Sequence, residues 1–249
     1  MTVATRQVGS MTVHALDDGE GLFFSPRTEA FADATTAQWA MADEFDPGAV
    51  TADGQWFLRF RAFAIRLDDG RVILVDAGIG PADAPASAWA PCPGRLPASL
   101  AEAGIDPAEI DTVVLTHLHT DHLGWTVGGL FPGAAVLLQR NELDWITPRL
   151  RSLLPHDQLV LLDGDSPLAS GVRVIATPGH TPGHQSVLVN QTMCITGDLL
   201  VHALQLVAPE VGYASEMDVE RARESRLAVL SIVDEIATAH LTEPFLTTR

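Results

Sequence analysis

A run of six residues, HLHTDH at positions 117–122, holds four side chains that bind divalent metals well. The run directly follows a short apolar stretch that we predict to be a β-strand. In an extended segment, side chains two residues apart point to the same side, so His117 and His119 can approach one ion. Asp121 and His122 come slightly later and can face a second ion. A solvated polar loop would rarely hold four such ligands in six residues, and the spacing therefore predicts a metal centre.

Three further candidate ligands occur downstream. The segment TPGHTPGH, at positions 177–184, combines prolines and glycines in a stiff loop that lets its backbone come close to whatever His180 binds. Asp198 follows another apolar stretch and places a carboxylate at a strand end, where it could bridge two cations or simply form a turn. His240 follows a predicted long helix, and taken alone it fits equally well a histidine stabilised by the helix dipole.

Together, HLHTDH, TPGHTPGH, TGD and the late histidine resemble the ligand motifs of the metallo-β-lactamase fold superfamily, and the resemblance spans Met11 to His240. It implies an α/β fold, a four-layer αββα sandwich of two mixed β-sheets flanked by helices, with a dinuclear site at one edge. It also implies a ligand for every metal position: His117, His119 and His180 for the first metal, Asp121, His122 and His240 for the second, and Asp198 as the bridge.

The sequence differs from several branches of the superfamily, and these differences limit the branches that it can resemble. Class B1 β-lactamases differ by a cysteine at the position of Asp198, and nuclease members have a positive surface, whereas this chain has a formal net charge of -17. The remaining resemblance is to small dizinc hydrolases similar to N-acyl homoserine lactonases and methyl parathion hydrolase. Lactonases of this type place a tyrosine three residues after the bridging aspartate, but Val201 stands there, and the only tyrosine, Tyr213, lies in a loop-like stretch.

The function implied is a dinuclear metal-dependent hydrolase acting on a small-molecule lactone, ester or phosphoester, with a hydroxide bridging the metals as nucleophile. Asp121 and Asp198 are its expected catalytic residues, and Asp121 would orient the hydroxide and accept its proton. Zinc is the first choice of metal, while iron, manganese and cobalt accept the same nitrogen and oxygen ligands. The alternative is a metal-binding member that does not hydrolyse, such as a polyketide cyclase-like or signalling protein.

Composition excludes several other functions. Acidic residues outnumber basic ones by 32 to 15, which disfavours nucleic acid and membrane surfaces as partners and leaves a small-molecule substrate. All basic residues are arginines, so lysine chemistry is excluded. Cys92 and Cys194 are too few for a disulfide framework, and no apolar run reaches signal-peptide or membrane-spanning length. We expect a cytoplasmic protein.

Apolar patterning predicts the elements that position these ligands within one domain over residues 1–249. Expected strands are Met11 to Leu16, Leu58 to Leu67, Arg71 to Asp76, Thr112 to Thr116, Ala134 to Leu138, Val172 to Ala176, Ser186 to Val189 and Thr192 to Thr196. Expected helices are Leu96 to Ala103, Pro107 to Ile110, Arg140 to Leu150 and Met217 to Ala239.

Residues 20–57 are predicted to be irregular and rich in aromatic side chains, and they could form local core, a pocket lid or a homodimer contact. Besides the seven proposed ligands, His184 and His202 could orient ligands or could be ordinary buried histidines. Asp76 could accept hydrogen bonds from the ligand loop or cap a turn.

Overall fold

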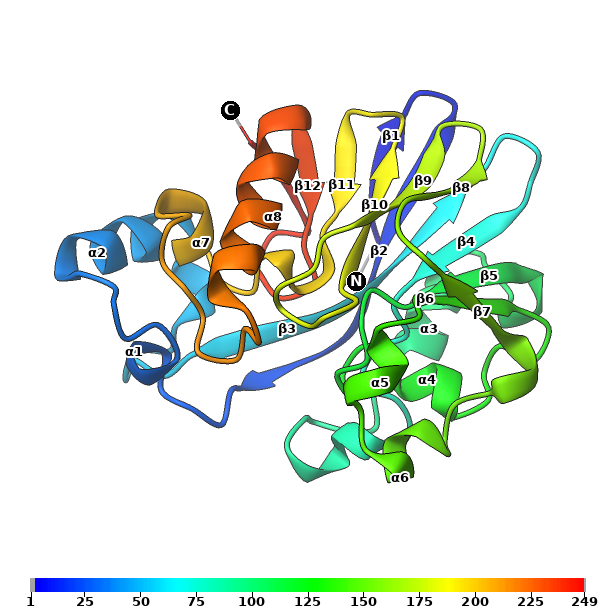
Figure 1. The fold of residues 1–249 in the computed structure, drawn as a ribbon, viewed down its shortest axis with the longest axis horizontal. Helices are drawn as coiled ribbons and strands as arrows, with labels where there is room; N and C mark the ends of the chain where they lie inside the picture. Colours follow the sequence, from blue (N-terminus) through cyan, green and yellow to red (C-terminus); the bar gives the residue numbers. More distant parts are fainter. Residues whose placement is uncertain (1–2, 249) are drawn as a thin grey trace.

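Two β-sheets pack face to face in the computed structural model, which describes residues 3–248 (Figure 1). The first sheet has the strand order β1-β2-β3-β4-β5-β6-β7, antiparallel from β1 to β4 and parallel from β4 to β7. Its strands are β1 (Ala4–Val8), β2 (Met11–Leu22), β3 (Phe57–Arg66), β4 (Val72–Val75), β5 (Ile110–Val114), β6 (Ala135–Gln139) and β7 (Leu159–Leu162).

The second sheet has the order β13-β12-β11-β10-β9-β8 and is also mixed, because β11 and β12 are parallel while the other neighbours are antiparallel. Its strands are β8 (Ser166–Ala169), β9 (Val172–Ala176), β10 (Gln185–Val189), β11 (Met193–Ile195), β12 (Glu235–Ala237) and β13 (Phe245–Thr247). The predicted α/β sandwich of two mixed sheets is therefore confirmed.

Helices cover the outer faces of both sheets (Figure 1). The α-helices are α1 (Arg27–Ala30), α2 (Thr36–Phe45), α3 (Leu96–Glu102), α4 (Gly124–Val127), α5 (Glu142–Trp145), α6 (Pro148–Arg151), α7 (Leu204–Val207) and α8 (Val219–Ile232). Short 3-10 helices occur at Pro47–Ala49, Pro85–Ala88, Pro107–Glu109, His156–Gln158 and Gly197–Leu199. None of the helices within residues 3–248 combines the length and apolar character needed to cross a bilayer.

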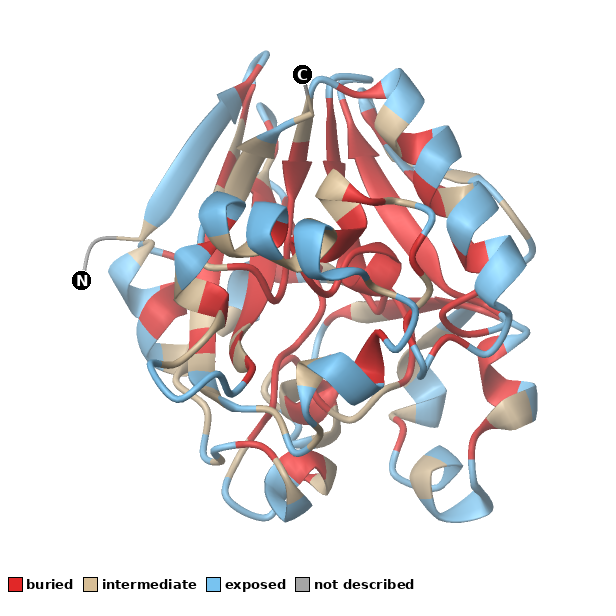
Figure 2. Ribbon diagram, turned by 90° about the vertical axis from the view of Figure 1, so that its left-hand side faces the viewer, coloured by how far each residue is buried: buried red, intermediate tan, exposed pale blue. Residues whose placement is uncertain are grey.

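Alternation of side chains along the strands builds the layers of the core. In β10, Val187 and Val189 face the first sheet, whereas Leu188 between them packs toward α8. The same alternation in β4 and β5 sends Leu74 and Val113 outward against α3. Buried residues consequently concentrate along the strands, and exposed ones on the outer surfaces of the helices and on β1 (Figure 2).

Three of the helix predictions differ from the structure in extent or in helix type. The helix expected over Arg140 to Leu150 is two short helices, α5 and α6, because Ile146 is extended and Pro148 starts a new helix. The side chain of Thr147 caps that second helix by accepting a hydrogen bond from the Leu150 amide, N to Oγ1 3.2 Å.

The helix expected over Met217 to Ala239 ends at Ile232, and the chain then forms β12, parallel to β11. His240 therefore follows a strand rather than a helix. Nearer the amino terminus, β2 continues to Leu22, and the segment expected to be irregular over residues 20–57 also contains α1 and α2. The predicted helix at Pro107 to Ile110 is a single 3-10 turn capped by Asp106, and Ile110 already belongs to β5.

Candidate metal centre

Each predicted ligand lies just after the carboxyl end of a strand, at one edge of the sandwich. The HLHTDH run (residues 117–122) follows β5, and His180 lies in the loop between β9 and β10. Asp198 lies in the 3-10 turn after β11, and His240 lies in the loop after β12. Strands of both sheets thus deliver ligands to the same edge.

The seven predicted side chains form two groups whose ligand atoms lie within 4.8 Å of one another. The first cluster is His117, His119, His180 and Asp198; the second cluster is Asp121, His122 and His240. All seven fall in one of these two clusters, although they come from positions as far apart as 117 and 240.

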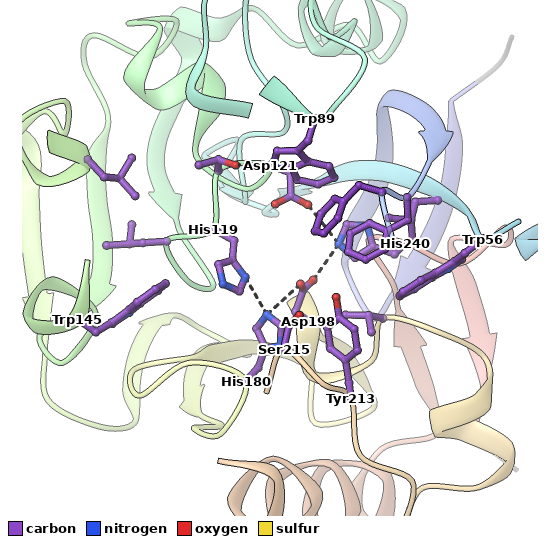
Figure 3. Close-up of a pocket in the computed structure, with 17 residues that line it drawn as sticks. Trp56, Trp89, His119, Asp121, Trp145, His180, Asp198, Tyr213, Ser215 and His240 are labelled. Carbon is purple, nitrogen blue, oxygen red and sulfur yellow. Dashed lines mark hydrogen bonds and ion pairs between the residues drawn. The ribbon is translucent and has the colours of Figure 1, made fainter. Parts of the chain in front are cut away.

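Asp198 lies between the two clusters and presents one oxygen to each (Figure 3). Its Oδ2 is 3.6 Å from Nε2 of His117 and 3.2 Å from Nε2 of His180. Its Oδ1 is 3.1 Å from Nε2 of His122 and 3.0 Å from Nε2 of His240. A carboxylate placed in this way can contact two cations at once.

The ring nitrogens fit a cation better than they fit one another. Nδ1 of His119 lies 2.9 Å from Nε2 of His117 and also 2.9 Å from Nε2 of His180. Neutral imidazoles carry one N–H each, so three mutually close nitrogens cannot all be paired by hydrogen bonds. A nitrogen and oxygen donor set of this kind suits a divalent metal such as zinc.

Burial keeps two histidines of the first cluster, His117 and His119, in the neutral form that binds metal. Burial, reinforced by the charge of His180, lowers the pKa of His119 to about 3, and burial likewise lowers the pKa of His117. Burial opposes ionisation of Asp198, but the charges of His122 and His240 outweigh it and hold the pKa of that carboxyl well below its usual range. His117 and His119 thus offer neutral imidazoles, and Asp198 offers an ionised carboxylate.

Neighbouring groups fix the orientation of the ligand rings. His240 donates from Nδ1 to the carbonyl oxygen of Arg59 at 2.7 Å, which leaves its Nε2 facing Asp198. His184 is not in either cluster; its Nε2 accepts a hydrogen bond from the Asp198 amide at 3.1 Å, so it positions the loop that carries Asp198. His202 lies farther away, among Phe31, Trp39 and Trp56, with Nδ1 accepting from the Leu204 amide.

A glycine lets the His180 loop lie against α8. Gly179 has φ +136, and a Cβ added there would lie 2.1 Å from the backbone nitrogen of Ala222. Both the backbone conformation and the close approach therefore require glycine.

Both clusters open into one cavity of about 340 Å³. Its walls are largely aromatic, and Asp121, His119, His180, Asp198 and His240 lie on its floor (Figure 3). The aromatic lining residues are Phe23, Phe24, Trp56, Trp89, Trp145 and Tyr213. The lining residues, all within the described chain, include no arginine, so apart from histidine the cavity offers no cation to an anionic substrate.

A sequence profile of the family described as the metallo-beta-lactamase superfamily matches residues 61–234, which span β3 to the end of α8. The chain belongs to this superfamily. The Xenopus laevis metallo-beta-lactamase domain-containing protein 1 is 31% identical over 180 residues, covering 69% of this chain and 70% of that protein.

Curated lactonases match a shorter part of this superfamily member. An N-acyl homoserine lactonase of Bacillus thuringiensis is 32% identical over 99 residues, which are 38% of this chain and 39% of the lactonase. The match thus spans about two fifths of the length of those relatives.

Solved structures of the superfamily match nearly the whole chain. A hydrolase named AbOPH has 26% identity and a TM-score of 0.74, over 98% of this chain and 91% of that one. The dizinc quorum-quenching lactonase AidC, in complex with the product N-hexnoyl-L-homoserine, has 21% identity and a TM-score of 0.81, over 99% of this chain and 93% of that one. At that identity the second likeness shows the fold alone.

Tyr213 is a pocket residue of this superfamily member rather than a remote structural one. Its ring stacks on His180, with centroids 6.1 Å apart and an interplanar angle of 4°, and its hydroxyl points toward Asp198 (Figure 3). A buried carboxylate, Glu216, accepts a hydrogen bond from the Tyr213 amide at 3.0 Å. The loop-like sequence around Tyr213 gave no signal of this placement.

Sequence reasoning also missed Trp145, Arg61 and Glu142. Trp145 lines the cavity, while Arg61 donates to the carbonyl oxygens of Leu241 and Thr242 and so holds the loop after His240. Only the long-range folding of the chain brings these residues to the site, so local spacing could not have identified them.

Proposed function

We propose that the chain is a dinuclear metal-dependent hydrolase of neutral, apolar lactones, esters or phosphoesters. The observation that carries the proposal is the shared Asp198, which lies between two ligand clusters at the floor of one aromatic cavity. The curated lactonases and the hydrolase of known structure support the same class of reaction.

We propose that the seven clustered residues hold two metal ions, zinc in the first instance. When bound, such ions polarise a carbonyl or phosphoryl oxygen and lower the pKa of a coordinated water. Asp198 would supply a ligand to both ions, and the rings of His122 and His240, set by their own hydrogen bonds, would hold the second ion.

Two residues of the cavity lining would supply a proton acceptor and a hydrogen-bond donor. Asp121 lies on the floor, where its carboxylate could accept a proton from a water bound there. Burial raises the pKa of Tyr213, so its hydroxyl stays protonated and can donate a hydrogen bond to a substrate oxygen.

The cavity walls favour neutral substrates with an aromatic or aliphatic group. Aromatic rings bury apolar surface well, and no arginine lines the cavity to pair with a carboxylate or a phosphate monoester. Residues 20–57 contribute Phe23, Phe24 and Trp56 to these walls, so we propose that this segment forms the substrate-binding wall of the single domain. Both cysteines are free, which suits the cytoplasmic location that we propose.

The test is metal analysis combined with a substrate panel. We expect two equivalents of divalent metal per chain and turnover of neutral lactones, aryl esters or phosphotriesters, with little activity on a β-lactam that carries a carboxylate. Asp198→Ala should lose metal and turnover together. A fully metallated protein that turns over none of these compounds would instead favour the non-hydrolytic alternative.

A further inference from the structure

A buried glutamate outside both clusters receives three N–H groups. Glu142, at the start of α5, is 0% exposed. Its Oε2 accepts from the Leu118 amide and from the Trp145 indole Nε1, each at 3.0 Å, and its Oε1 accepts from the Gly183 amide at 2.8 Å. These three bonds occupy three of the roughly four acceptor positions of the carboxylate.

The three donors belong to different parts of the candidate site. Leu118 lies between His117 and His119, and Gly183 lies in the loop that carries His180. Trp145 lines the cavity, and its ring contacts the ring of His119 edge-on, with centroids 5.6 Å apart. One side chain thus links both loops that supply the first cluster's histidines, and it also holds one wall of the cavity.

The close approach of the second loop depends on glycine. A Cβ added at Gly183 would lie 2.8 Å from the backbone nitrogen of Glu142 and 2.9 Å from its Cγ. Any larger residue at that position would push the loop away from the carboxylate.

We propose that Glu142 is a positioning residue that fixes the His117–His119 segment relative to the His180 loop, and so sets the geometry of the first cluster. The inference rests on the proposed metal centre, because its consequence is the affinity of that cluster for metal. The link itself is a property of the protein without metal, and can be measured separately.

Glutamine at position 142 tests the link with little change in shape. The oxygen of the glutamine side chain can accept either from the Leu118 amide and the Trp145 indole or from the Gly183 amide. The NH₂ group then faces the N–H of the donor on the other side, with which it cannot form a hydrogen bond. At least one buried backbone amide loses its acceptor, which is costly in a buried position.

A matched control exists in the same fold. Asp18 is also buried, and it accepts from two backbone amides, Ile79 and Leu96, each at 2.6 Å, and from the indole of Trp125 at 3.0 Å. None of these donors lies in a ligand loop. Asp18→Asn therefore disrupts the same kind of carboxylate without touching either loop.

The experiment compares the wild-type protein, Glu142→Gln and Asp18→Asn by amide hydrogen exchange of the metal-free proteins and by zinc titration against a chelator. We expect Glu142→Gln to speed exchange at least tenfold in peptides covering residues 115–123 or 177–185. Its zinc affinity at the tighter site should fall about 10- to 100-fold, the usual cost of losing an outer partner of a metal ligand. Asp18→Asn should change both quantities less than about twofold.

The inference would be overturned if Glu142→Gln had the same loop exchange rates and zinc affinity as the wild-type protein. It would also be overturned if Asp18→Asn lost as much zinc affinity as Glu142→Gln. If Glu142→Gln does not fold, Gly183→Ala keeps the carboxylate and displaces only the loop, and it should lower zinc affinity in the same direction; unchanged affinity there would refute the role. If the wild-type protein binds no metal, the proposed function is refuted. If Glu142→Gln nevertheless exchanges faster than the wild-type protein in the two loops, the link through Glu142 still stands.

Discussion

Oδ2 of Asp76 lies 2.8 Å from Nδ1 of His122, and both side chains are buried. Thr116 completes the arrangement by donating its amide N–H to Oδ1 of Asp76 at 2.8 Å. Because Nδ1 of His122 donates to Asp76, Nε2 is the ring nitrogen that faces Asp121 and Asp198 and that a metal can bind in place of a proton. Asp76 therefore selects the tautomer of His122 that can bind a metal.

Replacing Asp76 with asparagine should empty the second cluster selectively. Asp76 has φ +61, a conformation that asparagine tolerates, so the backbone should be retained. The amide NH₂ would face Nδ1 of His122 and favour the tautomer with a proton on Nε2. We expect affinity for the second metal to fall roughly 10- to 100-fold. Metal content after a graded chelator challenge measures this.

Asp69→Asn is the control for that experiment, since Asp69 bonds only in the exposed hairpin with Arg71. The comparison is made at a chelator concentration that leaves Asp69→Asn fully loaded with metal. If Asp76→Asn also retained two metals there, Asp76 would not be needed to orient His122.

Phe24 should contribute to substrate binding but not to the chemical step. It lines the cavity and is 71% exposed, so an apolar substrate can cover its ring. Phe24→Ala should raise KM for an aryl ester or a long-chain lactone about fivefold, which corresponds to about 1 kcal/mol of lost apolar contact. The ring of Phe24 contacts the rings of Phe23 and Trp89, which are not ligand residues, so kcat should be unchanged.

Met41→Ala is the matched control, because Met41 is an exposed apolar residue, 52% accessible, that does not line the cavity. Equal KM values for Phe24→Ala and the wild-type protein on apolar substrates would remove Phe24 from the binding wall.

Much of the site could be predicted because metal ligands depend on residue type and on strand ends, both of which are local. The apolar stretch Val172 to Ala176 is β9 as predicted, and the motif residues after the strands converge. The pairing of strands that are distant in the sequence could not be predicted from local patterns. After Ile232 the chain forms β12 because β11 offers a parallel edge, and this partner lies some forty residues earlier in the sequence.

The supporting residues of the site were harder to predict for a related reason. Glu142 lies near the start of the helix predicted over Arg140 to Leu150, and nothing in that pattern marks it as buried; packing against the two ligand loops buries it. Tyr213 reaches the cavity because Glu216, itself paired with buried Arg226, holds its backbone. Such residues are defined by contacts between distant segments, which spacing along one segment does not reveal.

His202 should make the folded protein less stable in mild acid. Burial, with a smaller contribution from the charge of Arg27, lowers the pKa of His202 from 6.5 to about 3, against an opposing effect of Asp43. Between these values the unfolded chain binds a proton at His202 that the folded chain does not. The free energy of unfolding therefore rises with pH in this window, by up to about 1.4 kcal/mol per unit from this residue.

His202→Asn isolates that contribution, because the asparagine oxygen can still accept the hydrogen bond that the Leu204 amide donates to Nδ1. Denaturant unfolding at several pH values from 4 to 6.5 should give a shallower dependence for the variant, whatever its stability at neutral pH. Parallel lines for the two proteins would show that His202 is not buried in its neutral form.

Gly179→Ala should disturb the His180 loop far more than an alanine at another left-handed glycine. A Cβ at Gly179 would lie 2.1 Å from the nitrogen and 2.3 Å from the Cα of Ala222, so either the loop or the start of α8 must move. Gly54→Ala is the comparison, since Gly54 has φ +83 but no atom within 4 Å of an added Cβ. Backbone strain alone costs about 1–3 kcal/mol, and the forced displacement adds a further cost of about 1–3 kcal/mol. We therefore expect Gly179→Ala to lose more stability and to bind zinc more weakly, whereas Gly54→Ala loses stability alone; equal zinc affinity in both variants would show that the loop can shift without moving His180.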